Sequence, residues 1–186
     1  MRALKGIRKK DLQKTKSNLL IAFCWLNAIA NRFHLDLEKS VWNRFPGVCS
    51  YCGNAPCRCR KIKLSKRVKI KRDELQKPST FSQFQAMFEK IYPPKGRSLV
   101  DAGIHLAEET GEVNETISIY LGEHKKAQFE KISEELADWT SCMFGIANSA
   151  KINVEGELTK RFKNGCHTCH HTPCTCNFSF VANFES

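Results

Sequence analysis

Four acidic residues stand at helical spacing between residues 105 and 148 of this chain. Glu109 and Glu112 are three residues apart, which puts both on one face of a helix, and Glu135 and Asp138 repeat the spacing in the next periodic stretch. A short connection would make the two helices antiparallel neighbours, so that the four carboxylates can converge. Unpaired, they would repel one another and raise their own pKa values. A divalent cation removes that repulsion, and Mg²⁺ prefers oxygen ligands that it often shares with phosphates.

Two amphipathic helices with solvated glutamates would show the same acidic spacing. Apolar residues beside the acids argue against a purely solvated face, because they would place the carboxylates at the rim of a packed interface. These residues are Leu106, Val113 and Ile117 on the first helix and Ile132, Leu136 and Phe144 on the second. Gly111 lies inside the first helix at a propensity cost of ~1 kcal/mol, and we expect it to permit a close backbone approach.

The acidic pair resembles the signature of the MazG-like family of all-α nucleoside triphosphate pyrophosphatases, which is ExxE, a variable gap and ExxD. Here it reads Glu109-Thr-Gly-Glu112, 22 residues, then Glu135-Leu-Ala-Asp138. The segment FQAMFEKIYPPKGRSLVDAGIHLAEETGEV is similar to the family's first helix and the lead into its second. The resemblance covers Phe81 to about Phe162. It implies an α-helical bundle that hydrolyses a (d)NTP between its α and β phosphates, giving a nucleoside monophosphate and pyrophosphate.

The resemblance also implies roles for single residues. Glu109, Glu112, Glu135 and Asp138 would be the magnesium ligands. The carboxylates that could accept the proton of the attacking water, or else be solvated, are Glu108 and Glu134. The candidates for contact with the nucleotide or its phosphates are His105, Lys160 and Arg161, each of which could equally be an ordinary structural or surface residue. Family members assemble as dimers or tetramers, so we expect a homo-oligomer.

The elements that must position these residues are all helical in pattern. Apolar residues at intervals of three and four predict helices over 81–91, 99–121 and 129–150, and no strand-rich region appears. We expect an all-α bundle with a catalytic part over 81–164, preceded by a helical repeat over 1–59 and a basic linker over 60–80, and followed by a second cysteine module and tail over 165–186.

An internal repeat relates the two ends of the chain at a shift of 117 residues. The segments 29–59 and 146–176 share 11 of 31 positions, including Ile-Ala-Asn, Arg-Phe, four cysteines and one proline. The same shift places Ser17, Asn18 and Ile21 opposite Glu134, Glu135 and Asp138. The first copy is therefore expected to have no acidic site of its own, and to serve as packing, as a lid or in place of a partner subunit.

Each copy ends in a C-x2-C-x4-C-x-C module. Four thiolates satisfy tetrahedral Zn²⁺ with no open position, which is typical of a structural site. The expected ligand sets are Cys49, Cys52, Cys57 and Cys59, and Cys166, Cys169, Cys174 and Cys176. Ligands shared between the modules, or an iron–sulfur cluster, are the alternatives. The other two cysteines, Cys24 and Cys142, lie in apolar stretches, which indicates small buried hydrophobic residues.

Charge is divided unevenly along the chain. Residues 1–77 hold 20 Lys and Arg against 5 Asp and Glu, whereas residues 78–186 hold 10 against 14, and the net charge is +11. The basic part could meet nucleic acid or be a solvated linker. The alternative to the enzyme is thus a zinc-containing nucleic-acid-binding protein with a non-catalytic helical dimerisation bundle.

The apolar run 19–30 is too short to span a bilayer, and we expect a cytoplasmic protein that does not bind membranes.

Overall fold

The chain folds into helices around one central helix, α5. A computed structural model describes residues 8–95 and 98–176, and over these residues every regular element is a helix. The helices are α1 Lys9–Arg32, α2 Leu37–Arg44, α3 Phe81–Ile91, α4 Leu99–Glu123, α5 Lys126–Ala150 and α6 Val154–Arg161, with a 3-10 turn at Glu74–Gln76. The predicted all-helical class is confirmed for the described ranges.

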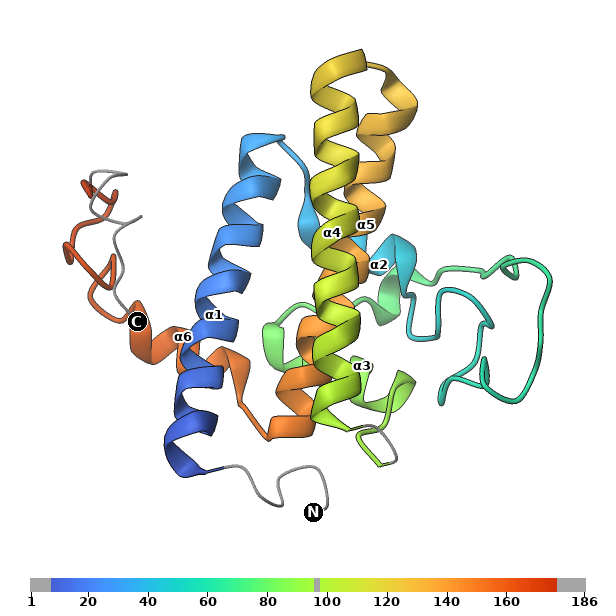
Figure 1. Cartoon of the computed structure of the whole chain (residues 1–186), viewed down its shortest axis with the longest axis horizontal. Coiled ribbons are helices and arrows are strands. Elements are labelled where there is room, and N and C mark those ends of the chain that lie inside the picture. The colour runs from blue at the N-terminus through green and yellow to red at the C-terminus, as the bar shows by residue number, and fades with distance from the viewer. Residues whose placement is uncertain (1–7, 96–97, 177–186) are drawn as a thin grey trace.

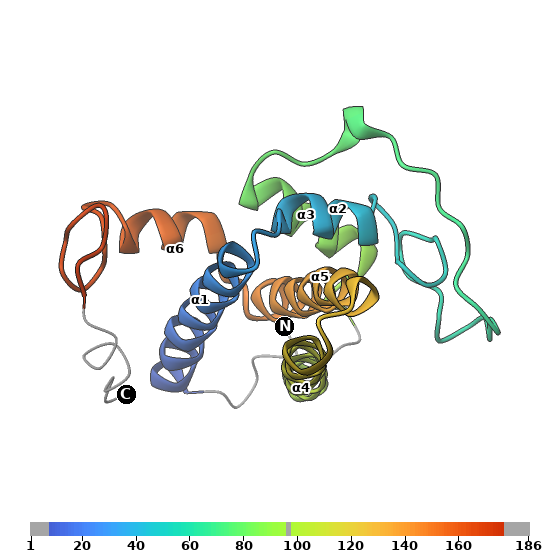
Figure 2. The same ribbon diagram turned by 90° about the horizontal axis from the view of Figure 1, so that it is seen from above.

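Helix α5 is buried along most of its second half. From Leu136 to Ala150 every residue except Asp138 and Asn148 is buried, because α1, α2, α3 and α4 all pack against it. Helix α4 runs back along α5 as an antiparallel hairpin (Figure 1), and it stands at the side of α5 away from α2 and α3 (Figure 2). Of the apolar stripes predicted for α4 and α5, Val113, Ile132 and Leu136 are buried. Phe144 is buried too, but it packs against Phe23 of α1 and Phe88 of α3.

Side-chain caps explain where several helices begin. Ser98 and Asp101 form a capping box at α4, in which each side chain accepts the other residue's backbone N–H. Asp36 caps α2 by accepting from the Lys39 N–H, and Asn153 caps α6 by accepting from the Gly156 N–H. These last two caps are 117 residues apart, as the repeat requires.

The repeat extends to the order of elements within each copy, a long helix followed by a short one, and does not include α3 and α4. Helices α1 and α5 begin 117 residues apart, α2 and α6 have the same length and shift, and the residues that follow the long helices, His34 and Lys151, both take positive φ. The two copies are interleaved. Helix α2 of the first copy packs against α5 of the second, whereas α6 of the second is joined to α1 of the first by an ion pair and a hydrogen bond.

The basic segment that follows the first cysteine module has no regular element apart from the 3-10 turn. It runs beside that module and is tied to it by hydrogen bonds. The Val68 N–H donates to the Tyr51 carbonyl at 3.1 Å, the Tyr51 hydroxyl donates to the Leu64 carbonyl at 2.9 Å, and Arg67 Nη1 donates to Ser50 Oγ at 3.2 Å. In the described part of the chain, no helix combines the length and the apolar character that crossing a membrane demands.

Candidate functional site

Three of the four predicted acids meet in the interface between α4 and α5. Glu109 of α4 and Glu135 and Asp138 of α5 each offer a carboxylate oxygen, and the three oxygens lie within 4.8 Å of one another. Glu135 is buried, with 7% of its surface exposed, and the other two are half-buried. The i, i+3 spacing on α5 and the antiparallel pairing with α4 together produce the cluster.

This cluster is electrostatically unfavourable without a counter-charge. Burial, followed by the carboxylates of Asp138, Glu112 and Glu135, raises the pKa of Glu109 to about 7. Burial and the neighbouring carboxylates, Asp138 first, also raise the pKa of Glu135. In addition, Glu109 Oε2 is buried and has no hydrogen-bond partner among the residues that the structure describes. The acids are thus held together by the packing of the two helices, against their own repulsion.

Two basic side chains contact the cluster. Lys131 Nζ lies 3.7 Å from Glu135 Oε1, and the closer contacts come from Arg44, at the last turn of α2. Its Nε lies 3.1 Å from both carboxylate oxygens of Asp138, its Nη2 lies 2.5 Å from Asp138 Oδ2, and its Nη1 lies 2.8 Å from Glu134 Oε2. The Arg44 side chain is only 14% exposed. Local sequence spacing did not predict this contact of Arg44, although the repeat aligns it with Arg161, which was a candidate for phosphate binding.

The other predicted residues take several positions. Glu112 is exposed and lies outside the three-oxygen cluster, although its charge contributes to the raised pKa of Glu109 and of Glu135. Glu108 and His105 form an exposed pair, with Nδ1 and Oε2 at 2.9 Å. Glu134 is the partner of Arg44 described above.

The two basic candidates on α6 lie away from the acids. Lys160 Nζ is 3.4 Å from Glu157 Oε1, and Arg161 Nη2 donates to Ser17 Oγ at 2.8 Å. Both contacts join α6 to itself or to α1, and neither of these helices contributes to the acidic cluster. The structure therefore does not bring Lys160 or Arg161 to the predicted magnesium ligands.

The expectation for Gly111 is wrong. A Cβ atom built on Gly111 would meet nothing within 4 Å, and the residue is exposed. No neighbouring backbone approaches α4 at this position, so the glycine provides no close contact to the helix pair.

A cleft of about 570 Å³ opens beside Arg44 and Glu134. Its other walls come from the first turns of α5, with Phe129 and Ser133, and from the basic segment, which contributes Arg67 and Arg72. Two arginines separated from the acids in sequence thus face the same space as Arg44. The basic segment, expected as a linker, forms one wall of a cleft next to the acidic cluster.

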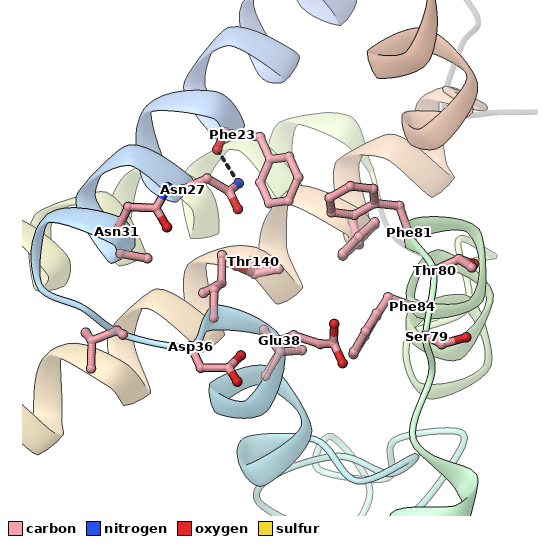
Figure 3. A pocket seen from close by; sticks show the side chains of 15 residues that line it. Phe23, Asn27, Asn31, Asp36, Glu38, Ser79, Thr80, Phe81, Phe84 and Thr140 are labelled. Atoms are coloured by element: carbon pink, nitrogen blue, oxygen red, sulfur yellow. Dashed lines mark hydrogen bonds between the residues drawn. The ribbon is translucent and has the colours of Figure 1, made fainter. Parts of the chain in front are cut away.

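A separate cavity of about 380 Å³ lies among α1, α2, α3 and α5. Phe81 and Phe84 of α3 form an aromatic wall, and Asn27 of α1, whose amide donates to the Phe23 carbonyl at 2.7 Å, lies across from them (Figure 3). Thr140 of α5 forms its floor. None of the predicted site residues lines this cavity, so it does not share the chemistry of the acidic cluster.

Both cysteine modules have the geometry of a zinc site. A tetrahedron with Zn–S bonds of ~2.3 Å has S–S edges of about 3.8 Å. In the first module Cys49–Cys59 and Cys52–Cys57 Sγ distances are 3.6 and 3.9 Å. In the second, the matching Cys166–Cys176 and Cys169–Cys174 distances are 3.7 and 3.8 Å. Each module therefore gathers its own four ligands, as predicted, and no sharing between modules is needed.

Backbone N–H groups act to lower the pKa of Cys52 in the first module and of Cys166 and Cys169 in the second. Burial acts to raise the pKa of Cys52, but N–H donors from Arg58 and Asn54 lower it to about 6. The N–H groups of Thr175 and His171 lower the pKa of Cys169 to about 5. Because metal ligation requires the thiolate, these donors favour binding of a cation such as Zn²⁺.

The two modules differ in their relation to the core. They lie at opposite ends of the molecule (Figures 1 and 2). In the first, Cys49 and Cys52 are buried, and the Cys57 N–H donates to the Ile91 carbonyl at 2.8 Å. In the second, Cys174 is exposed.

Comparisons with family models, with curated proteins and with solved structures find no match to this chain.

Proposed function

We propose that the chain is a magnesium-dependent nucleoside triphosphate pyrophosphohydrolase of the MazG-like type. The observation that carries the proposal is the convergence of Glu109, Glu135 and Asp138 between two antiparallel helices. Arg44 and Lys131 partly offset the charges of Asp138 and Glu135, but the pKa of Glu109 is still raised to about 7, so a bound cation would relieve a repulsion that remains. The products would be a nucleoside monophosphate and pyrophosphate.

The residues at the cluster suit a magnesium ion. All the available ligand atoms are carboxylate oxygens, which is the donor type that Mg²⁺ prefers. Glu109 Oε2 is buried without a hydrogen-bond partner, as a ligand atom reserved for a cation would be. Glu109, Glu135 and Asp138 would hold the ion, and Glu112, one turn from Glu109 on α4, would complete the set implied by the resemblance. When bound, the ion supplies neutralisation of phosphate charge and a lowered pKa for a bound water.

Arg44 links the acids to the adjacent cleft. Its planar guanidinium presents several N–H donors in a geometry that fits a phosphate as well as a carboxylate. A triphosphate in the cleft would compete for these donors, and an Arg44 that turned toward it would leave Asp138 with its full charge for a cation. Arg67 and Arg72, on the opposite wall, would hold the outer phosphates.

Glu134 is the better placed of the two candidate bases. It lines the cleft and contacts Arg44, whereas Glu108 is paired with His105 on an exposed face of α4. A carboxylate at the wall of the cleft could accept a proton from water attacking the α phosphorus. The proposed zinc ions have a structural role, since four thiolates leave no open position.

One observation favours a second function, binding of nucleic acid. The basic segment carries a row of exposed cations, namely Lys61, Lys63, Lys66, Lys69 and Lys71. Such a row attracts a phosphate backbone, and binding would fall steeply with salt.

The expected homo-oligomer also remains a prediction. Helix α4 has the exposed apolar residues Val100, Ile104 and Leu121, which a second copy could cover.

The decisive test is pyrophosphate release from a panel of NTPs and dNTPs by the zinc-loaded protein, with and without Mg²⁺. We expect magnesium-dependent release that Glu135→Gln abolishes. Glu115→Gln, which removes an exposed acid from α4 outside the cluster, is the matched control and should retain activity. Turnover that survives Glu135→Gln, or absence of pyrophosphate for every nucleotide, would refute the proposal.

A further inference from the structure

A small pocket of about 210 Å³ lies between α1 and α6. Gln13, Lys16 and Ser17 line it from α1, and Glu157, Lys160 and Arg161 line it from α6. The acidic cluster and its arginine are built on α2, α4 and α5. The pocket therefore shares no helix with the proposed magnesium site.

Positive charge exceeds negative charge in this pocket. Glu157 is its single carboxylate, and it is shared by Lys16 at 2.9 Å and Lys160 at 3.4 Å. Arg161 has no carboxylate partner within the described ranges 8–95 and 98–176. Its Nη2 donates to Ser17 Oγ, and its Nη1 is buried without an acceptor. A partly buried guanidinium with unsatisfied donors is costly unless an anion meets it.

The duplication explains how this imbalance arises. Arg161 is the repeat counterpart of Arg44, and each arginine contacts the long helix of the other copy. Arg44 meets Glu134 and Asp138 there. At the corresponding positions Arg161 meets Ser17, in place of Glu134, and the chain has Ile21 in place of Asp138. The long helix of the first copy, α1, thus lacks both carboxylates with which α5 neutralises Arg44, whereas both arginines are present.

We propose that this pocket binds a small phosphate-class anion, orthophosphate or pyrophosphate, at the position where the long helix of the first copy lacks these acids. Arg161 is the central ligand, because its fork of N–H donors matches phosphate oxygens. Lys16 and Lys160 add charge at the rim, and the Ser17 hydroxyl and Gln13 amide add neutral donors. This site is distinct from the phosphate-binding wall of the cleft, and it stands whether or not the acidic cluster hydrolyses a nucleotide.

The test is calorimetric titration of the full-length, zinc-loaded, magnesium-free protein with orthophosphate and with pyrophosphate at low ionic strength. Arg161→Gln should weaken the tighter-binding anion by about tenfold or more, since hydrogen bonds to charged groups are lost. Lys126→Gln, which removes an exposed cation at the start of α5 and outside this pocket, is the matched control and should retain the binding that Arg161→Gln removes. Circular dichroism would verify that both variants are folded.

A second variant acts in the opposite direction. Glu157→Gln leaves Lys16 and Lys160 without their carboxylate, so anion affinity should rise by about threefold. The proposal is overturned if Arg161→Gln binds both anions as tightly as the wild type, if Lys126→Gln weakens binding as much as Arg161→Gln does, or if Glu157→Gln weakens it.

Discussion

Replacing Glu109 by glutamine should stabilise the magnesium-free protein and remove its activity. In the folded state, burial and neighbouring carboxylates hold the pKa of Glu109 at about 7, against an ordinary value of 4.5. The folded protein therefore binds a proton here more tightly than the unfolded chain does. The resulting penalty is absent below pH 4.5, grows as the pH rises and is complete above pH 7. Glutamine cannot ionise, so the variant avoids the penalty at every pH.

The size of the effect follows from the difference between the two pKa values. The shift corresponds to ~3 kcal/mol, and because Glu109 is only half-buried, screening by solvent reduces it to about 1–2 kcal/mol. For a chain of 186 residues, this should raise the melting temperature by about 3–6 °C above pH 7. Below pH 4.5 the wild type and the variant should melt together.

Thermal melts of the zinc-loaded protein between pH 4.5 and 8.5, without and then with Mg²⁺, measure this directly. Magnesium should stabilise the wild type, because it binds the folded state, and should stabilise Glu109→Gln much less. Glu115→Gln serves as the control and should follow the wild type at every pH. A variant that is no more stable than the wild type at pH 8, or one that gains as much from Mg²⁺, would refute the electrostatic reasoning.

Three further predictions concern the repeat, the helix and the zinc modules. Arg44→Gln should lower the free energy of unfolding by about 2–3 kcal/mol, because it leaves the largely buried carboxylate of Asp138 unpaired. Arg161 has no carboxylate partner among the described residues, so Arg161→Gln should lower it by less than about 1 kcal/mol. Denaturant titrations measure both values, and equal costs would contradict the prediction. Gly111→Ala should add about 0.5–1 kcal/mol with unchanged activity, since the position is open and helical, and a loss of stability would contradict it. Cys52→Ser should unfold the first module and part of the core. Cys169→Ser should remove one bound zinc and leave the melting temperature of the core nearly unchanged. Zinc analysis and thermal melts test this, and equal losses of melting temperature in the two variants would contradict it.

The helix pair and the acids could be predicted because their evidence is local. Residues three apart share a helical face whatever the rest of the fold does, so the spacing of Glu135 and Asp138 predicted their convergence. The predicted ends of the helices were less accurate than their positions. Helix α5 begins at Lys126, before the predicted residue 129, and no side chain caps it, so the sequence offered no start signal.

The role of Arg44 could not be read from local spacing. It is 94 residues from Asp138 in sequence, and only the interleaving of the two copies brings α2 against α5. The repeat aligned Arg44 with Arg161 but did not show which long helix each would face. For the same reason, the position of Lys160 and Arg161, which were candidates for phosphate contact, on a helix that meets α1 could not be predicted.

The most direct test of the central claim is whether the acidic cluster holds a divalent cation together with a triphosphate. Mn²⁺ can replace Mg²⁺ as a paramagnetic probe of the same oxygen ligands. The zinc-loaded protein is titrated with Mn²⁺ in the presence of an α,β-methylene nucleotide and followed by electron paramagnetic resonance. The wild type should show protein-bound Mn²⁺. The triple variant Glu109→Gln/Glu135→Gln/Asp138→Asn should show none beyond the Mn²⁺ that the nucleotide binds by itself. Equal Mn²⁺ binding by the two proteins would contradict the account.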